Sequence, residues 1–281
     1  MRIINTNEVL TSMIPNVVTT VEGEKPLIDK IDRWLTDAED WVTATFTGED
    51  VMEAIANDPS SLVWEHVAQL VVTEALRNAI PSLDVVLTPN GFGIVSNNNV
   101  APASRERIDR LIQQMAQQRD HFINMLLADL PAIDAWHNSK QYDWFAASLL
   151  QSPKACVTAV LDRAREGQQW DQFLQLRSRA VTIEDALAER WISRAVMTQL
   201  RTELLKAEPD ADVLEVAVKV RACVFYELRG NTRNHWDLDR ITDYIRKNPS
   251  LFPDWATSET AKLFDNPPVF RNKKNSSGYF F

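Results

Sequence analysis

Apolar residues recur every three or four positions through most of the 281-residue chain, and this spacing constrains the fold more than any other feature. An α-helix turns once in about 3.6 residues, so side chains at this spacing lie on one face. Glycine, which helices disfavour on entropic grounds, occurs only 7 times. The pattern predicts an all-α fold, a multi-helix bundle. Its first stripe consists of Leu27, Ile31, Trp34, Leu35, Ala38, Trp41, Val42 and Phe46.

Breaks in the periodicity divide the chain into four parts. Residues 1–25 are expected to form an irregular or partly extended N-terminal arm. Residues 26–150 are predicted to form a first helical unit and residues 151–265 a second. Residues 266–281 form a polar, basic C-terminal tail that ends in three aromatic residues.

Two boundaries inside the helical units are predicted from their residue types. A helix that begins near residue 59 is expected to end before Pro81, because proline pushes the preceding residue out of helical geometry. Another helix is expected to begin at Thr182, which with Asp185 resembles a capping box.

Residues 84–95 depart from the helical pattern. Two β-branched runs flank Asn90-Gly91, a dipeptide that supplies the positive φ angles of a tight turn. A small β-hairpin, inserted into the first helical unit at about residues 84–95, is therefore expected.

The two halves of the chain share a short sequence. Residues 38–42 (AEDWV) resemble residues 188–192 (AERWI), 150 positions later, and the same offset aligns Pro59 with Pro209. An internal duplication of a helix pair is the hypothesis, because a duplicated unit can bury its apolar faces against its copy. The alternative is a chance match between residues that are common in helices.

Charge and hydropathy restrict the class of partner and the compartment. The formal net charge of −9 disfavours nucleic acid, whose binding needs clustered Lys and Arg. No run approaches the roughly 18 apolar residues of a membrane span. The first residues lack the apolar region of a signal peptide, so a cytoplasmic location is expected. Cys156 and Cys223 lie in apolar helical patterns and are predicted to be buried free thiols.

The search for chemistry yields no catalytic, cofactor or metal site. The four histidines, His66, His121, His137 and His235, lack the spacing of zinc ligands. Asp120 and His121 are neighbours in sequence, so a helix points their side chains apart. These observations favour a protein that is not an enzyme and binds no cofactor.

Tryptophan occurs nine times, which is frequent for this length. The four on apolar stripes are assigned to the core: Trp34, Trp41, Trp64 and Trp191. The other five lie near expected helix ends beside polar residues and are either core residues or anchors for a partner: Trp136, Trp144, Trp170, Trp236 and Trp255.

Two irregular segments are the candidate partner-binding sites. In the hairpin they comprise Asn90, Gly91, Phe92 and Gly93, although turn chemistry alone explains these residues. In the tail they comprise Tyr279, Phe280 and Phe281, because aromatic side chains are disfavoured in water. The alternative for the tail is a disordered segment with no partner.

Five segments together resemble an uncharacterised family of helical proteins that phage-like and mobile elements of Bacteroidetes encode. The segments are residues 3–10, 38–42, 90–94, 101–104 and 278–281. The first half also resembles, more distantly, the small helical adaptors of tailed-phage head–tail connectors, although the chain is about twice as long and carries the inserted hairpin.

The resemblance implies a phage or prophage structural protein of the head–tail adaptor or head-completion kind. Its partners would be portal-like or tail proteins and copies of itself, in the virion or the cytoplasm. The alternative is a host scaffold or regulatory protein that binds a partner through exposed tryptophans. A helical enzyme with a site built from carboxylates is the third hypothesis.

Overall fold

A computed structural model describes residues 2–14, 25–83, 85–88, 91–94, 104–157, 159–161, 165–231 and 235–264. The fold is all-α, as predicted, and the helices share one continuous hydrophobic core. Within the described ranges, no helix is both long and apolar enough to cross a membrane. The turn residue Asn90 and the tail residues 279–281 lie outside these ranges.

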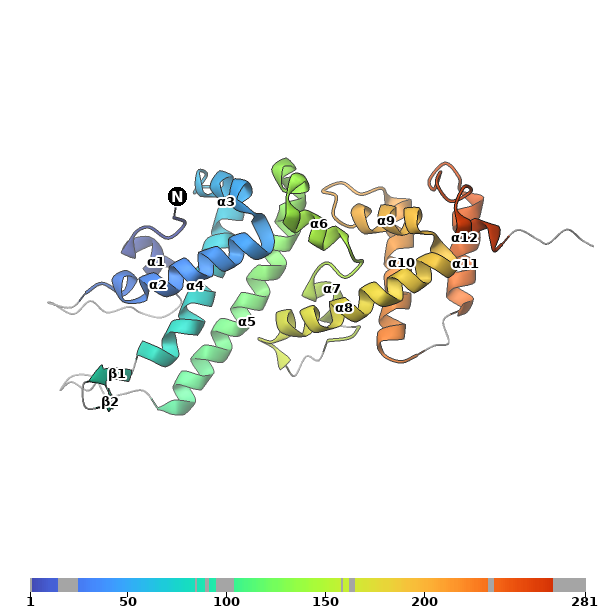
Figure 1. Cartoon of the computed structure of the whole chain (residues 1–281). Coiled ribbons are helices and arrows are strands. Elements are labelled where there is room, and N and C mark those ends of the chain that lie inside the picture. The colour runs from blue at the N-terminus through green and yellow to red at the C-terminus, as the bar shows by residue number, and fades with distance from the viewer. Residues whose placement is uncertain are drawn as a thin grey trace, which may run out of the picture.

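The helices form two successive sets, which Figure 1 shows one after the other along the molecule. The first set comprises α1 (Asn7–Met13), α2 (Leu27–Val42), the π-helix η1 (Thr43–Thr47), α3 (Glu49–Ala56), α4 (Leu62–Leu83), α5 (Arg105–Asp129), the 3₁₀ helices η2 (Leu130–Ala132) and η3 (Asp134–Asn138), and α6 (Lys140–Ala146). The second set comprises α7 (Pro153–Val157), α8 (Gln169–Leu187), the π-helix η5 (Ala188–Ile192), α9 (Arg194–Glu203), α10 (Ala211–Leu228), α11 (His235–Lys247) and α12 (Glu259–Lys262).

The apolar stripes form the core as their spacing predicts. On α2 the buried residues are Ile31, Leu35, Ala38 and Val42, each three or four positions after the last, and they face α4. Helices α4 and α5 pack along each other as a long antiparallel pair (Figure 1). Two short strands, β1 (Val85–Thr88) and β2 (Gly91–Ile94), lie between these helices in sequence and pair antiparallel, at the place expected for the hairpin.

Both sets contain the same irregular element. Helices α2 and α8 each end in a five-residue π-helix, and a residue with positive φ follows. That residue is Gly48 in the first set (φ 78°, ψ 168°) and Ser193 in the second (φ 72°, ψ 152°). Their amides close the π-helices by donating to the carbonyls of Thr43 and Ala188, at 2.8 and 2.9 Å. Equivalent positions in the two sets therefore lie 145 residues apart.

The same carbonyls of each π-helix accept side-chain hydrogen bonds. In η1, Gln141 Nε2 donates to Ala44 (3.0 Å) and Thr43 (3.5 Å), and Trp136 Nε1 donates to Phe46 (2.8 Å). In η5, the carbonyls of Ala188 and Glu189 accept from Thr260 Oγ1 (3.0 and 3.2 Å), and that of Trp191 accepts from Thr242 Oγ1 (3.0 Å). A π-helix disturbs the regular bonding of its carbonyls, and these side chains supply further donors to them, in addition to the closing amides at Thr43 and Ala188.

Three expectations about local structure are wrong. The N-terminal arm contains a helix, α1, whose first turn Thr6 caps by accepting from the Val9 amide. Helix α4 continues through Pro81 to Leu83, since a proline in the last turn removes only one hydrogen bond. Thr182 lies inside α8, and its hydroxyl donates to the Ser178 carbonyl instead of capping a helix.

The predicted pairing of the two halves at an offset of 150 does not match the positions of the π-helices. At the observed offset of 145, Trp191 corresponds to Phe46, and Trp41 has a different position in its helix. The similarity between AEDWV and AERWI therefore gives no support to a duplication.

Gly48 and Ser193 make matched tests of the backbone at the π-helix. Both adopt a conformation that essentially only glycine tolerates, at a cost of about 1–3 kcal/mol for other residues. Gly48→Ala should lower the free energy of unfolding by about that amount, since its Cβ also falls 2.9 Å from Gln141 Oε1. Ser193→Gly should leave stability unchanged or raise it by about 1 kcal/mol. Glycine relieves the backbone strain, and losing the serine hydroxyl that accepts from the Val196 amide at the N-cap of α9 costs little when glycine takes its place. Urea unfolding measures both, and equal losses in the two variants would contradict this explanation.

Candidate functional site

The two sets of helices meet where the chain after α6 lies against α8. Two charged side chains of α8, Arg177 and Glu184, bind this linker, and both are buried. The Arg177 guanidinium donates to the carbonyls of Trp144, Phe145 and Leu150. Glu184 accepts from the Leu149 amide, at 3.0 Å to each carboxylate oxygen. The two side chains are seven positions apart, so they share one face of α8 and bind the end of α6 and the linker from that face.

Burial changes the proton affinity of both charged groups. Desolvation lowers the pKa of Arg177 to about 10, which still leaves the guanidinium charged at neutral pH. Desolvation also raises the pKa of Glu184, while Arg201 and the hydrogen bonds from Ser148 and Leu149 oppose the increase. Arg201 Nε donates to Glu184 at 2.8 Å and Ser148 Oγ at 2.7 Å. These donors supply the pairing that a buried carboxylate needs.

A second polar contact holds the start of α8 against α5. The buried carboxylate of Asp120 accepts from the amides of Gln169 (2.9 Å) and Trp170 (3.4 Å). Gln168, at the N-cap of α8, makes no side-chain capping bond, so Asp120 supplies the cap from another helix. Arg119 donates to both Asp120 and Asp171 at 3.3 Å. Desolvation raises the pKa of Asp120, and the two amides and Arg119 oppose it.

The clamped junction forms a groove of about 460 Å³ beside η1. Residues from four elements, α2, η1, α6 and α8, line it: Trp41, Ala44, Thr45, Lys140, Gln141, Trp144, Trp170 and Leu174. Trp144 and Leu174 are each 40 % exposed, whereas Trp170 is buried beneath them and lies 5.0 Å from Phe46, centroid to centroid. The Arg177 guanidinium carbon lies 3.8 Å from the Trp144 ring centroid, which fixes that ring in place. We refer to this surface as the tryptophan groove.

The burial of the tryptophans decides between the alternatives that the sequence left open. Of the five that were either core residues or anchors, Trp136, Trp170 and Trp255 are buried in the core. The four that were assigned to the core are half-buried and pack against it: Trp34, Trp41, Trp64 and Trp191. Trp144 remains exposed, as an anchor should be. The sequence lacked the signal for this groove, because its walls come from α2, η1, α6 and α8, and only the tertiary fold joins them.

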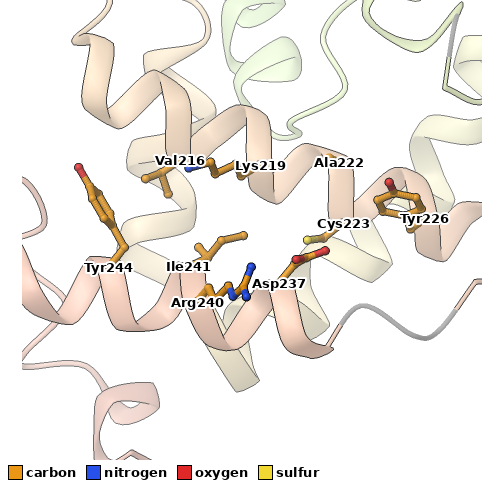
Figure 2. Close-up of a pocket in the computed structure, with 9 residues that line it drawn as sticks. All are labelled: Val216, Lys219, Ala222, Cys223, Tyr226, Asp237, Arg240, Ile241 and Tyr244. Carbon is orange, nitrogen blue, oxygen red and sulfur yellow. The ribbon is translucent and has the colours of Figure 1, made fainter.

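A second pocket, of about 420 Å³, lies between α10 and α11 (Figure 2). Val216, Lys219 and Cys223 face it from α10, and Asp237 and Ile241 from α11. Tyr226 and Tyr244 lie at its two ends and are 42 % and 40 % exposed. The floor is apolar and the acidic and basic groups are on the walls, which suits an amphipathic ligand but brings no set of catalytic groups together.

The candidate chemical groups are used in structural contacts. Within the described residues, no group of three or more His, Cys, Asp or Glu side chains could hold a metal ion. Asp120 is buried and bonded to the start of α8, whereas its neighbour His121 is exposed. His66 Nδ1 lies 2.5 Å from Asp129 Oδ2 in a largely buried pair.

Of the partner-binding residues proposed from the sequence, those that the structure describes line neither pocket. Gly91, Phe92 and Gly93 are on β2, where Phe92 is paired with Leu87 and Gly93 with Val86. Asn90 and residues 279–281 are outside the described part of the chain. Their role in binding therefore stays a prediction.

Comparison with known proteins gives one match. Residues 18–146 match the sequence model of a family of unknown function, DUF6712. The matched range contains α2 to α6 and ends at the last residue of α6. No curated protein and no solved structure matches the chain. The first helical set is therefore similar to a family whose activity is not known.

Glu184 and Glu39 offer a matched test of how strongly α8 holds the linker. Glu39 lies 145 positions before Glu184 and accepts from the Ile3 amide at 3.3 and 3.4 Å, but it is only half-buried. Glu184→Ala should cost about 3 kcal/mol or more, because it leaves Arg201 and the Leu149 amide without a buried partner. Glu39→Ala should cost about 1 kcal/mol. Urea unfolding of both variants checks the order, and an equal or reversed order would show that Glu184 does not hold the junction.

The two cysteines are free and buried, as predicted, and their alkylation tests the pocket of Figure 2. Desolvation raises the pKa of Cys156 to about 12 and that of Cys223 to about 11. Both native thiols should therefore react slowly with iodoacetamide at pH 8, because the thiolate is the nucleophile. Cys223 should react first, since it lines the pocket. Mass spectrometry follows each site against the urea-unfolded chain, and earlier labelling of Cys156 would contradict the pocket.

Proposed function

We propose that the protein acts by binding other proteins and that the tryptophan groove is a contact surface. The observation that carries this proposal is the exposure of Trp144 and Leu174 around a hollow lined by two further tryptophans. Aromatic side chains that remain partly exposed around a concave surface are typical anchors for a partner's apolar residues. Lys140 and Gln141 at the edge supply polar groups that fix the orientation of a bound segment.

The process that we propose is the assembly of a phage-type particle, in the role of a head–tail adaptor or head-completion protein. The support for this role is the resemblance of the N-terminal arm, the helix around Trp41 and the Asn90-Gly91 turn to helical proteins of phage-like elements. The partners would be portal-like or tail proteins. A rigid helical body that exposes an aromatic groove suits such a role, because assembly contacts form between preshaped surfaces.

A host scaffold or regulatory protein is the second candidate, and the same groove supports it. The proteins that bind the groove distinguish the two candidates. An enzyme built on carboxylates is less well supported, because the buried acids Asp120 and Glu184 already accept backbone amides and arginine side chains. Both carboxylates therefore act in contacts within the protein.

We also propose that the two helical sets are copies of one ancestral unit, in the register of the π-helices. Three kinds of observation support it: the matched π-helices and positive-φ residues, the bonds to the same carbonyls, and the glutamates that accept from the preceding segment. After the π-helices, Trp136, Ser139 and Gln141 correspond to Trp255, Ser258 and Thr260, each 119 positions later. The offset between the sets falls from 145 to 119 because α10 and α11 are shorter than α4 and α5 and the segment that joins them is shorter as well.

Leu174→Asp tests the tryptophan groove. A charge in the groove should weaken partner binding at least tenfold, because the carboxylate must be desolvated against apolar partner groups. Stability should change little, since Leu174 is exposed. Val218→Asp, which replaces a residue of 43 % exposure on α10, is the matched control.

The measurement is the affinity for the purified products of neighbouring genes, by pull-down and calorimetry. Binding of a portal-like or tail protein that Leu174→Asp weakens and Val218→Asp leaves intact is the expected result. If no structural protein encoded nearby binds, the assembly role is wrong. If one binds and both variants bind it equally, the groove is not the contact surface.

A further inference from the structure

An aromatic cluster closes the first helical set at its junction with the second. Phe46 on η1, Trp136 on η3 and Phe145 on α6 are fully buried. The Phe145 centroid lies 6.3 Å from that of Phe46 and 6.2 Å from that of Trp136. The start of α8 covers this cluster with Trp170, which lies 5.0 Å from Phe46, and Phe173 packs on Trp170 at 5.3 Å.

The second set ends in a cluster of the same kind. Trp191 on η5, Trp255 and Phe264 occupy the positions of Phe46, Trp136 and Phe145. The Phe264 centroid lies 5.9 Å from that of Trp191 and 6.0 Å from that of Trp255. Their surroundings differ, however. Phe264 is only half-buried, whereas its counterpart Phe145 is completely buried.

The residue before Phe264 makes the difference clearer. Leu263 occupies the position of Trp144 and is 67 % exposed, the highest value among the large apolar side chains of the described chain. In the first set, the surface around Trp144 and Phe145 contacts α8 of the second set. In the second set, the corresponding surface around Leu263 and Phe264 lies beside α12, at the far end of the molecule from α1 and the start of α2 (Figure 1).

The junction inside the chain is heterologous, because the end of one set contacts the beginning of the next. Within the described residues, such an interface between similar units leaves one copy of each surface without a counterpart, one at each end of the pair. Tandem arrays that stop at their last unit cover it with a polar outer face. An exposed leucine beside a half-buried phenylalanine is not such a face.

We infer that the end of the second set, at Leu263 and Phe264, binds the outer face of α2 in a second copy of this chain, head to tail. Helix α2 is the counterpart of α8 in the π-helix register. Ile28 on α2 takes the position of Phe173 and is half-buried, so it supplies an apolar contact. Inside the chain, α8 occupies the corresponding surface of the first set. The surface at Leu263 and Phe264 is therefore expected to bind a helix of the same type.

The contact between copies is weaker than the one within the chain. Helix α8 begins three residues earlier than α2 in this register, so α2 has no helical counterpart of Trp170. Asp29 stands where α8 has Leu174, and Asp32 stands where it has Arg177. Asp32 is already bonded to Arg2, at 2.5 Å. Self-association should therefore be reversible and depend on concentration.

This inference rests on the proposed correspondence between the two sets and not on the tryptophan groove. A chain that stays monomeric yet binds a structural protein through Leu174 would remove this inference and leave the proposed function intact. A chain that associates head to tail and binds no such protein would do the reverse.

The test is sedimentation equilibrium of the full-length chain from micromolar to near-millimolar concentration. The wild type should associate, and Leu263→Asp should weaken association at least tenfold. Asp29→Leu, which copies Leu174 onto α2, should strengthen it. Val218→Asp should leave it unchanged. A wild-type chain that is monomeric throughout, or association that Leu263→Asp does not affect, would overturn the inference.

A mixing experiment tests the head-to-tail geometry. Leu263→Asp blocks one surface and Ile28→Asp the other, so each variant alone should stay monomeric. Their equimolar mixture should form a dimer and nothing larger, because each contributes its intact surface. A mixture that remains monomeric would contradict a heterologous contact. Thermal melting shows whether Ile28→Asp folds. If it does not, the effects of Leu263→Asp and Asp29→Leu on self-association decide. The first should weaken association and the second strengthen it, and any other pair of effects overturns the inference.

Discussion

The relative placement of the two helical sets depends on how α8 holds the linker between them. Arg177 and Glu184 are charged and buried, and either alone would be costly in the interior. They are tolerated because the end of α6 and the linker together offer three carbonyls to the guanidinium, and the linker offers an amide to the carboxylate. A hydrophobic pair would bury equally well but would not fix the path of the linker. The bonds to backbone groups specify one position of the linker on α8.

This fixed position produces the tryptophan groove. Asp120 caps the start of α8, so Trp170 lies against Phe46, and Arg177 holds Trp144 by its ring face. The rings are therefore set before any partner arrives. A preorganised aromatic surface loses little conformational entropy on binding, which favours affinity from a small contact area. The same polar contacts thus account for both the stability of the junction and its suitability as a binding surface.

The all-α fold, the main stripes and the buried thiols could be predicted from sequence, because periodicity and residue type report local burial directly. The π-helices could not, since a single wide turn changes spacing by one residue within an otherwise helical stripe. AEDWV lies in α2, whereas AERWI forms η5 itself, so matching the two sequences gave a register five residues from that of the π-helices. The glutamate in the stripe before each π-helix was the available signal, as a charged residue on an apolar face needs a partner. The groove was hidden for another reason: its walls are more than 100 residues apart in sequence, from Trp41 to Leu174.

The comparison of the two sets also explains why one end of the molecule differs from the other. At the junction, Phe46 and Phe145 are buried because α8 adds two aromatic rings. At the end of the second set, the described chain places no later helix over Phe264 and Leu263. In the proposed correspondence, the second set repeats the interior arrangement of the first but not its cover, which leaves Leu263 exposed. The proposed contact with another copy therefore follows from the position of this surface along the molecule more than from any single side chain.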